Sequence, residues 1–170
     1  MTFVPQTPSV GFPVIGAVVT TGGYNDVVPL GTVITATDPT YGSGEFIYLA
    51  GVASTAVGSV VTYNADDYST ALAAADAIGP IALAMAATVA DTKGWYQIGG
   101  KGVAKVLASF ADNANCYLTS TGGSIDDSVV AGDYIFRMKG ASAIGTPSTG
   151  LAVVELQRPF VKDGLDDAVT

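Results

Sequence analysis

The sequence predicts a mainly β protein: a small antiparallel β-barrel or sandwich with an extended N-terminal arm and at most one or two short helices. Short runs rich in Val, Ile, Thr and Tyr recur along the chain between Gly, Asn and Asp residues, as is typical of strands and turns. The 170 residues also include 21 glycines and 8 prolines, which interrupt the chain too often for long helices. Many short strands at this spacing favour a barrel or a sandwich.

The first 13 residues are predicted to form an extended arm. They contain Pro5, Pro8 and Pro13, which have no N–H donor and push the preceding residue toward an extended conformation. Apolar residues lie between these prolines, whereas a free tail is normally polar. We therefore expect the arm to dock, either on its own domain or on a neighbouring subunit.

Ten β-patterned runs follow the arm. The predicted strands are 14–20, 27–36, 45–52, 59–63, 81–87, 95–98, 103–108, 114–118, 133–139 and 152–156. The sequence GGKG at 99–102 predicts a hairpin between two of them. The alanine-rich run 69–77 could form a short helix, and 82–90 is ambiguous between helix and strand, with strand preferred.

The composition excludes several classes of function. There is no histidine, which removes Ser-His-Asp and Cys-His catalysis and His-ligated metals. The single Cys116 cannot form an intrachain disulfide or a structural zinc site, and it is predicted to be a buried small hydrophobe. The net charge of −8 argues against binding nucleic acid or an anionic membrane surface. The longest apolar run, 77–90, is too short to span a bilayer.

The basic residues are confined to the second half of the chain. Residues 1–92 carry seven acidic side chains and no basic one, and the first basic residue is Lys93. The basic side chains are Lys93, Lys101, Lys105, Arg137, Lys139, Arg158 and Lys162. Ordinary solvated charge is the simpler interpretation, and the alternative is that a few of them pair with an acidic partner surface.

The acidic residues do not indicate catalysis. The doublets at 66–67, 126–127 and 166–167 lack the DxDxDG pattern of a calcium loop and favour turns. The only glutamates, Glu45 and Glu155, lie in apolar strand patterns, where ion pairing is favoured over catalysis. Arg158 and Arg137 are the candidate partners of Glu155. We therefore expect no catalytic residue, no cofactor and no metal site.

Two further motifs have simple structural interpretations. GSG at 42–44 and GGKG at 99–102 are not phosphate loops, because GxxxxGK[ST] is absent. Trp95 and Tyr96 begin a predicted strand, and a place in the core is favoured over a recognition pair.

The order of five pieces between residues 51 and 161 carries a family resemblance. The pieces are VGSVVTYNADD (57–67), AIGPIALAMAAT (77–88), GWYQIGGKGVAKVLAS (94–109), NCYLTSTGGSIDDSVVAGDYIFRMKGA (115–141) and LAVVELQRPFV (151–161). In this order they resemble the head decoration proteins, or capsid cement proteins, of tailed bacteriophages. The chain would then consist of an arm (1–13), an additional β-patterned segment (14–50), a decoration-type β domain (51–161) and an acidic tail (162–170).

The resemblance implies a non-enzymatic virion protein on the outer surface of a phage capsid. Such proteins bind the major capsid protein, often as homotrimers, and stabilise contacts between capsomers. The residues expected to contact the capsid lie in the arm and in the last strand: Phe3, Val4, Pro5, Val10, Phe12, Arg158, Phe160 and Val161. The unusually apolar composition, with a mean hydropathy of +0.43, independently favours a protein that has partners.

Two other classes of function fit parts of the same sequence. A phage head fibre, a tail component or a host-surface adhesin would share the β-rich, low-charge composition. A glycan-cleaving enzyme would need two carboxylates that converge in a cleft, roughly 5–10 Å apart.

Overall fold

The computed structural model describes residues 3–5 and 11–162, and it is all-β across them. The strands are β1 (Val4–Pro5), β2 (Val18–Thr20), β3 (Val33–Asp38), β4 (Gly42–Ala50), β5 (Val60–Tyr63), β6 (Thr70–Leu72), β7 (Gly79–Ala84), β8 (Thr92–Lys105), β9 (Asn115–Leu118), β10 (Ile125–Asp126), β11 (Tyr134–Gly140) and β12 (Leu151–Val161). No helix occurs in this part of the chain. The mainly β prediction is confirmed.

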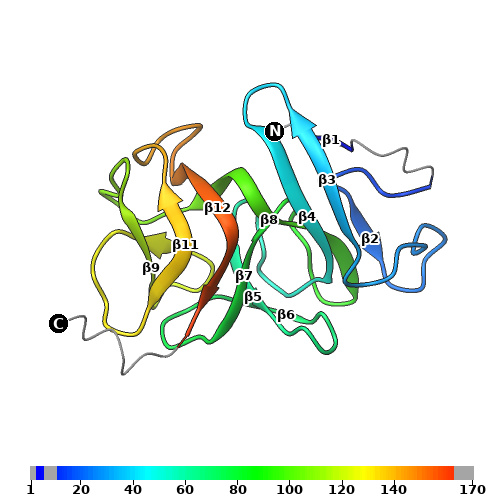
Figure 1. The fold of residues 1–170 in the computed structure, drawn as a ribbon. Coiled ribbons are helices and arrows are strands. Elements are labelled where there is room, and N and C mark those ends of the chain that lie inside the picture. The colour runs from blue at the N-terminus through cyan, green and yellow to red at the C-terminus, as the bar shows by residue number, and fades with distance from the viewer. Residues whose placement is uncertain (1–2, 6–10, 163–170) are drawn as a thin grey trace.

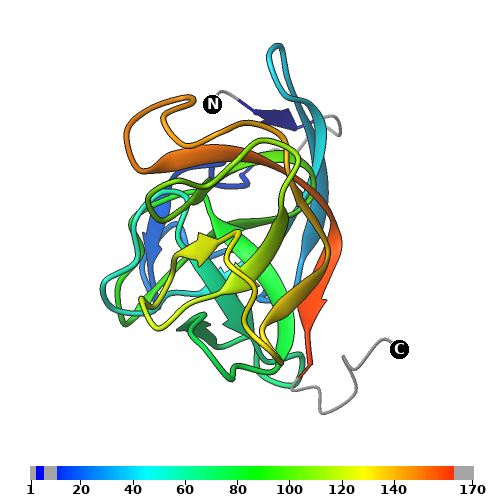
Figure 2. The same cartoon turned by 90° about the vertical axis from the view of Figure 1, so that its left-hand side faces the viewer.

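All twelve strands belong to one antiparallel sheet. Its main path is β1-β3-β4-β8-β7-β12-β11-β9-β10, while β2 pairs with β8, and β5 pairs with both β6 and β7. The sheet curls but does not close into a barrel, so the barrel, one of the two architectures that the strand spacing favoured, is not formed. Figure 1 shows β1 to β4 on one side of the molecule and β9, β11 and β12 on the other; Figure 2 shows the latter side facing the viewer.

Strand β8 joins these two sides. Its first half pairs with β4, from Ala50 opposite Lys93 to Phe46 opposite Gln97. Its second half pairs with β12 over seven positions, from residue 99 to residue 105. The additional segment 14–50 therefore continues the same sheet as the region 51–161, through the β4–β8 pairing (Figure 1).

The hairpin predicted at GGKG is wrong, because residues 99–102 lie inside β8. Gly100 adopts φ +87° where β4 passes close by, and a Cβ built on Gly100 would lie 2.3 Å from the carbonyl oxygen of Ser43. The buried amide of Gln97 donates hydrogen bonds to the carbonyls of Gly99 (3.0 Å) and Lys101 (2.8 Å). The glycines thus form an irregularity within a long strand. Glycine in a β pattern can mark such an irregularity as well as a turn.

The short helix considered for 69–77 is also wrong. Thr70–Leu72 forms β6, which pairs with β5. The Asp67 carboxylate accepts hydrogen bonds from the backbone N–H and the hydroxyl of Ser69, which fixes the turn into β6. Pairing with a neighbouring strand overrides the helix propensity of the alanines here. In 82–90, the preference for strand is confirmed for residues 82–84, which belong to β7, whereas residues 85–90 form no strand.

Three clusters of buried side chains form the core. The largest is enclosed by β7, β8, β9, β11 and β12 and includes Cys116. The other two contain Trp95 and Tyr96, which are neighbours on β8 and belong to different clusters because successive side chains of a strand point to opposite faces. Both aromatics have no exposed surface, so their place in the core is confirmed. Cys116 is fully buried as predicted, and burial raises the pKa of its thiol to about 12.

The buried hydroxyl of Tyr48 predicts a stabilising substitution. Tyr48 has no exposed surface, and its hydroxyl has no hydrogen-bond partner among the described residues. Water satisfies this hydroxyl in the unfolded chain, so Tyr48→Phe is expected to raise the free energy of unfolding by about 1 kcal/mol. The equally buried Tyr96 is a matched control, because its hydroxyl lies 2.7 Å from Oγ1 of Thr88. Tyr96→Phe is expected to lower the free energy by about 1 kcal/mol. Urea denaturation measures both, and equal losses for the two variants would contradict the prediction.

Candidate interaction surfaces

Residues 3–5 of the arm dock on the chain's own sheet. Val4 and Pro5 form β1, which pairs with Thr37 and Ala36 of β3. The Phe3 ring packs edge-on against Phe46 with ring centroids 4.8 Å apart, and Phe3 is only 7% exposed. Of these three predicted contact residues, Phe3 is therefore part of the core, Pro5 is half-buried, and Val4 is exposed.

The end of the arm covers Trp95. The indole N–H of Trp95 donates a hydrogen bond of 2.9 Å to the carbonyl oxygen of Pro13. The Phe12 ring lies 6.3 Å from the indole ring and remains partly exposed. Val10, the remaining arm residue predicted to contact a capsid, lies outside the described residues. Among the described arm residues predicted to contact a capsid, Phe12 and Val4 are consequently the ones with an exposed side chain.

The three contact residues predicted in β12 have different environments. Val161 is buried in the largest core cluster and does not reach the surface. Phe160 is exposed and stacks on Phe136, with ring centroids 5.1 Å apart and an interplanar angle of 10°. Arg158 forms an ion pair of 2.9 Å with Glu45, which raises the pKa of its guanidinium.

The pairing considered for Glu155 is wrong. Its carboxylate lies 3.8 Å from the Lys101 ammonium, opposite it on β8, and Arg158 pairs with Glu45 instead. Glu45 and Arg158 are separated by 113 positions in the sequence, and only the β4–β8–β12 arrangement brings them together. No local pattern in the sequence contains that information.

Four aromatic rings follow one another across β9, β11 and β12. We call Tyr117, Tyr134, Phe136 and Phe160 the aromatic row; consecutive ring centroids in it are 5.5, 4.9 and 5.1 Å apart. Cross-strand aromatic pairs stabilise a sheet, and here they also hold Phe160 at the surface. Sequence reasoning missed this row. The alternation of Tyr134 and Phe136 in a β-patterned run is the signal that could have indicated it.

A bulge interrupts the β11–β12 ladder beside the aromatic row. Phe136 faces Phe160 and Met138 faces Leu156, so the single residue Arg137 opposes three residues of β12. Arg137 and Arg158 both have positive φ angles, of 62° and 52°. The bulge changes the direction of the side chains at these positions. Its effect is that the Arg137 guanidinium lies 5.9 Å from the centre of the Phe160 ring.

The turn prediction is confirmed for Asp66 and Asp67, which lie in the turn between β5 and β6, but not for Asp126, which belongs to β10. Asn64 and Asp67 accept backbone hydrogen bonds within the β5–β6 turn, and Asp127 accepts one from Ala111. The hydrogen bonds of Ser69 to Asp67 lower the pKa of that carboxyl group. Residues 166–167 lie outside the described chain. In 3–5 and 11–162, no group of three His, Cys, Asp or Glu side chains could hold a metal ion.

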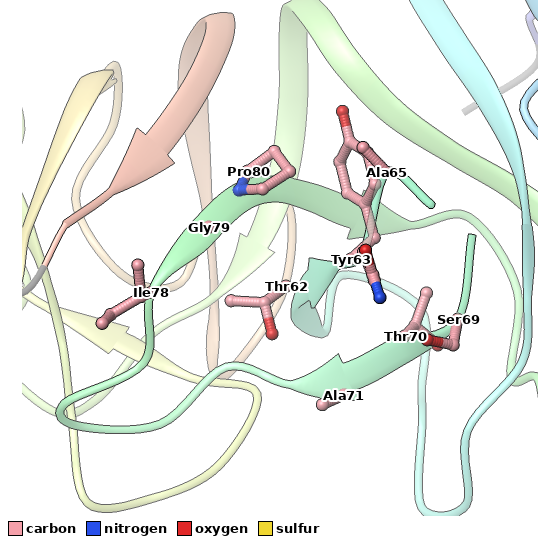
Figure 3. A pocket seen from close by; sticks show the side chains of 10 residues that line it. Thr62, Tyr63, Ala65, Ser69, Thr70, Ala71, Ile78, Gly79 and Pro80 are labelled. Atoms are coloured by element: carbon pink, nitrogen blue, oxygen red, sulfur yellow. The ribbon is translucent and has the colours of Figure 1, made fainter. Parts of the chain in front are cut away.

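Two of the open hollows on the surface of the sheet bear on the carboxylate cleft that a glycan-cleaving enzyme would need. One, of about 360 Å³, lies between β5, β6 and the start of β7; Figure 3 shows Thr70, Ala71, Ile78 and Pro80 around Thr62. Tyr63 is the single titratable group that lines it within the described chain, and burial raises the pKa of Tyr63. The second, of about 450 Å³, has Gly99 in its lining and is bordered by the Glu45–Arg158 ion pair. Neither hollow brings two carboxylates together.

Comparison of the chain with protein-family models, curated proteins and solved structures found no match. The described residues include no helix of the length and apolar character that crossing a membrane requires.

Proposed function

We propose that this chain is a non-enzymatic structural protein that binds the outer surface of a tailed-phage capsid and stabilises contacts between capsomers. The major capsid protein would be its partner in the virion, together with further copies of the chain as a homotrimer. The five ordered sequence pieces between residues 51 and 161 motivate the phage assignment. The observation that carries the structural role is the number of exposed apolar side chains in β1, β2, β3 and the described loops between them.

These exposed apolar side chains lie close to one another in sequence. Of the described residues within the first 33 positions, seven large hydrophobic ones are exposed: Val4, Phe12, Val14, Val18, Tyr24, Val27 and Val33. Single exposed hydrophobic residues are normal in soluble proteins, but a concentration of them favours an interface. Burial of this surface against a shell would stabilise the contact by about 25 cal/mol per Å², without any chemistry.

The environment of the acidic residues supports a non-enzymatic role. A carboxylic acid that protonates a glycosidic bond requires a raised pKa and a second carboxylate a short distance away. Glu45 and Glu155 each face a basic side chain instead. The pKa values of Asp26 and Asp67 are lowered by their hydrogen bonds to Lys93 and Ser69.

Capsid binding tests the proposal directly. Purified protein is mixed with expanded capsids of a matching phage that lack decoration, and co-sedimentation and the melting temperature of the capsids are measured. We expect binding and a higher melting temperature. Failure to bind any expanded capsid would contradict the proposal. Labelling of host cells would favour an adhesin instead.

Val4→Asp tests the contribution of the arm. Val4 is 61% exposed, so a charge there leaves the fold intact but must be desolvated at an apolar interface. Capsid affinity is expected to fall at least about tenfold, a loss of about 1.4 kcal/mol. Val129→Asp is the matched control, since Val129 is 80% exposed and distant in sequence from the arm. Deletion of the whole arm is a poorer test, because Phe3 and the Pro13 carbonyl contribute to the core.

A further inference from the structure

Most basic residues that remain without an acidic partner gather at one place in the fold. Lys93, Lys101 and Arg158 pair with Asp26, Glu155 and Glu45, at 2.7, 3.8 and 2.9 Å. The other four basic residues, Lys105, Arg137, Lys139 and Lys162, form no ion pair with any described residue. Three of these four lie on β11 or directly after β12.

Two of these three basic residues lie over rings of the aromatic row, and the third, Lys139, lines a hollow together with Tyr134. The Lys162 ammonium lies 5.7 Å from the centre of the Phe136 ring, and the Arg137 guanidinium lies over Phe160. Contacts of this kind at exposed sites are weak and leave the positive charge in place. Arg137 and Lys139 are exposed and line a hollow of about 250 Å³ together with Tyr134.

The local charge of this face opposes the charge of the whole chain. Glu155 is the single acidic residue that lines the hollow within the described chain; it faces Lys139 across the β11–β12 ladder, and Lys101 faces it from β8. Among the described residues, this face therefore has more basic than acidic side chains, although the net charge of the whole protein is −8. A positive face of this kind attracts a negatively charged partner and favours one orientation of that partner on the protein.

We propose that the face formed by Tyr134, Phe136, Phe160, Arg137, Lys139 and Lys162 docks a carboxylate-bearing protein surface. This inference rests on the proposed function and assigns an acidic, partly apolar patch to the capsid partner. Guanidinium and ammonium groups bind carboxylates by charge-assisted hydrogen bonds. The rings of Phe136 and Phe160 would cover apolar atoms beside them. Nucleic acid fits less well, because the remaining surface is acidic and would repel a phosphate backbone.

Single neutralising variants measure the contribution of this face. Lys139→Gln and Lys162→Gln are each expected to weaken binding to undecorated capsids by about twofold to fivefold, and the double variant by about tenfold. Lys105→Gln is the matched control, since Lys105 also has no ion-pair partner in the described chain but lies on β8. It is expected to leave binding unchanged. Unchanged fluorescence of Trp95 checks that each variant is folded.

The outcomes separate this inference from the proposed function. If the double variant binds capsids as tightly as the wild-type protein, the docking face is overturned, but the proposed capsid function stands. Absence of wild-type binding to any capsid would contradict the function, and a second probe then still tests the face. That probe is a polyglutamate peptide, titrated while backbone NMR shifts are recorded. Shifts confined to β11 and the end of β12 support the inference. Shifts elsewhere, or tighter binding of single-stranded DNA of equal charge, would overturn it.

Discussion

Replacing Trp95 by alanine is expected to lower the free energy of unfolding by about 4 kcal/mol. Trp95 has no exposed surface, and its ring lies 4.9 Å from the ring of Tyr48. Alanine would leave a large cavity in the cluster that joins the arm to β4 and β8. Most domains are stable by only about 5–15 kcal/mol, so this variant would be close to unfolding at elevated temperature.

Two further variants make the Trp95 prediction specific. Trp95→Phe keeps an aromatic ring but leaves the Pro13 carbonyl without its 2.9 Å donor, so an intermediate loss of about 1–2 kcal/mol is expected. Val129→Ala, at an 80% exposed position, is expected to change stability by less than about 0.5 kcal/mol. Trp95 is the only tryptophan, so urea denaturation must be followed by circular dichroism. A loss below about 1 kcal/mol for Trp95→Ala would show that the cluster is not packed as described.

Gly100→Ala is expected to lower the free energy of unfolding by about 3 kcal/mol or more. The position has φ +87°, and an added Cβ would lie 2.3 Å from the Ser43 carbonyl oxygen and 2.9 Å from the Gly44 Cα. Both neighbours are backbone atoms, so β4 and β8 would have to separate. Backbone strain alone costs about 1–2 kcal/mol, and loss of packing between the strands adds to it.

Gly145→Ala isolates the strain from the steric clash. Gly145 has φ +100°, but no atom lies within 4 Å of its added Cβ. We expect a loss of about 1–2 kcal/mol from strain alone. Trp95 fluorescence during urea denaturation reports both variants. If Gly100→Ala were no more destabilising than Gly145→Ala, the close approach of β4 to β8 would be disproved.

Local sequence patterns were sufficient to predict several strands. The run 59–63 corresponds to β5, 114–118 to β9 and 133–139 to β11, within one residue at each end. The runs 59–63 and 133–139 combine β-branched and aromatic residues, and 114–118 contains the aromatic Tyr117, so local and tertiary preferences agree. Where glycine residues did not form a turn, the predicted hairpin was wrong. At residues 99–102, the glycines permit close packing of strands and do not reverse the chain.

The surface could be predicted only in part, because strand periodicity does not identify the outward face. Phe160 and Val161 were expected to act together, yet adjacent residues in β12 point to opposite sides of the sheet. Phe160 is exposed and Val161 is buried, an assignment that depends on which strands lie on either side. The grouping of Arg137, Lys139 and Lys162 around the aromatic row likewise follows from the β9–β11–β12 order, which no local motif encodes.

The pairing of β8 with both β4 and β12 affects how the molecule unfolds. A strand that is hydrogen-bonded to β4 at one end and to β12 at the other cannot leave either side without disturbing its neighbours. The two sides are therefore expected to unfold as one cooperative unit, with the amide hydrogens in the middle of β8 exchanging with solvent only on global opening. A load applied to one side of the molecule would be carried by the β8 backbone to the other side.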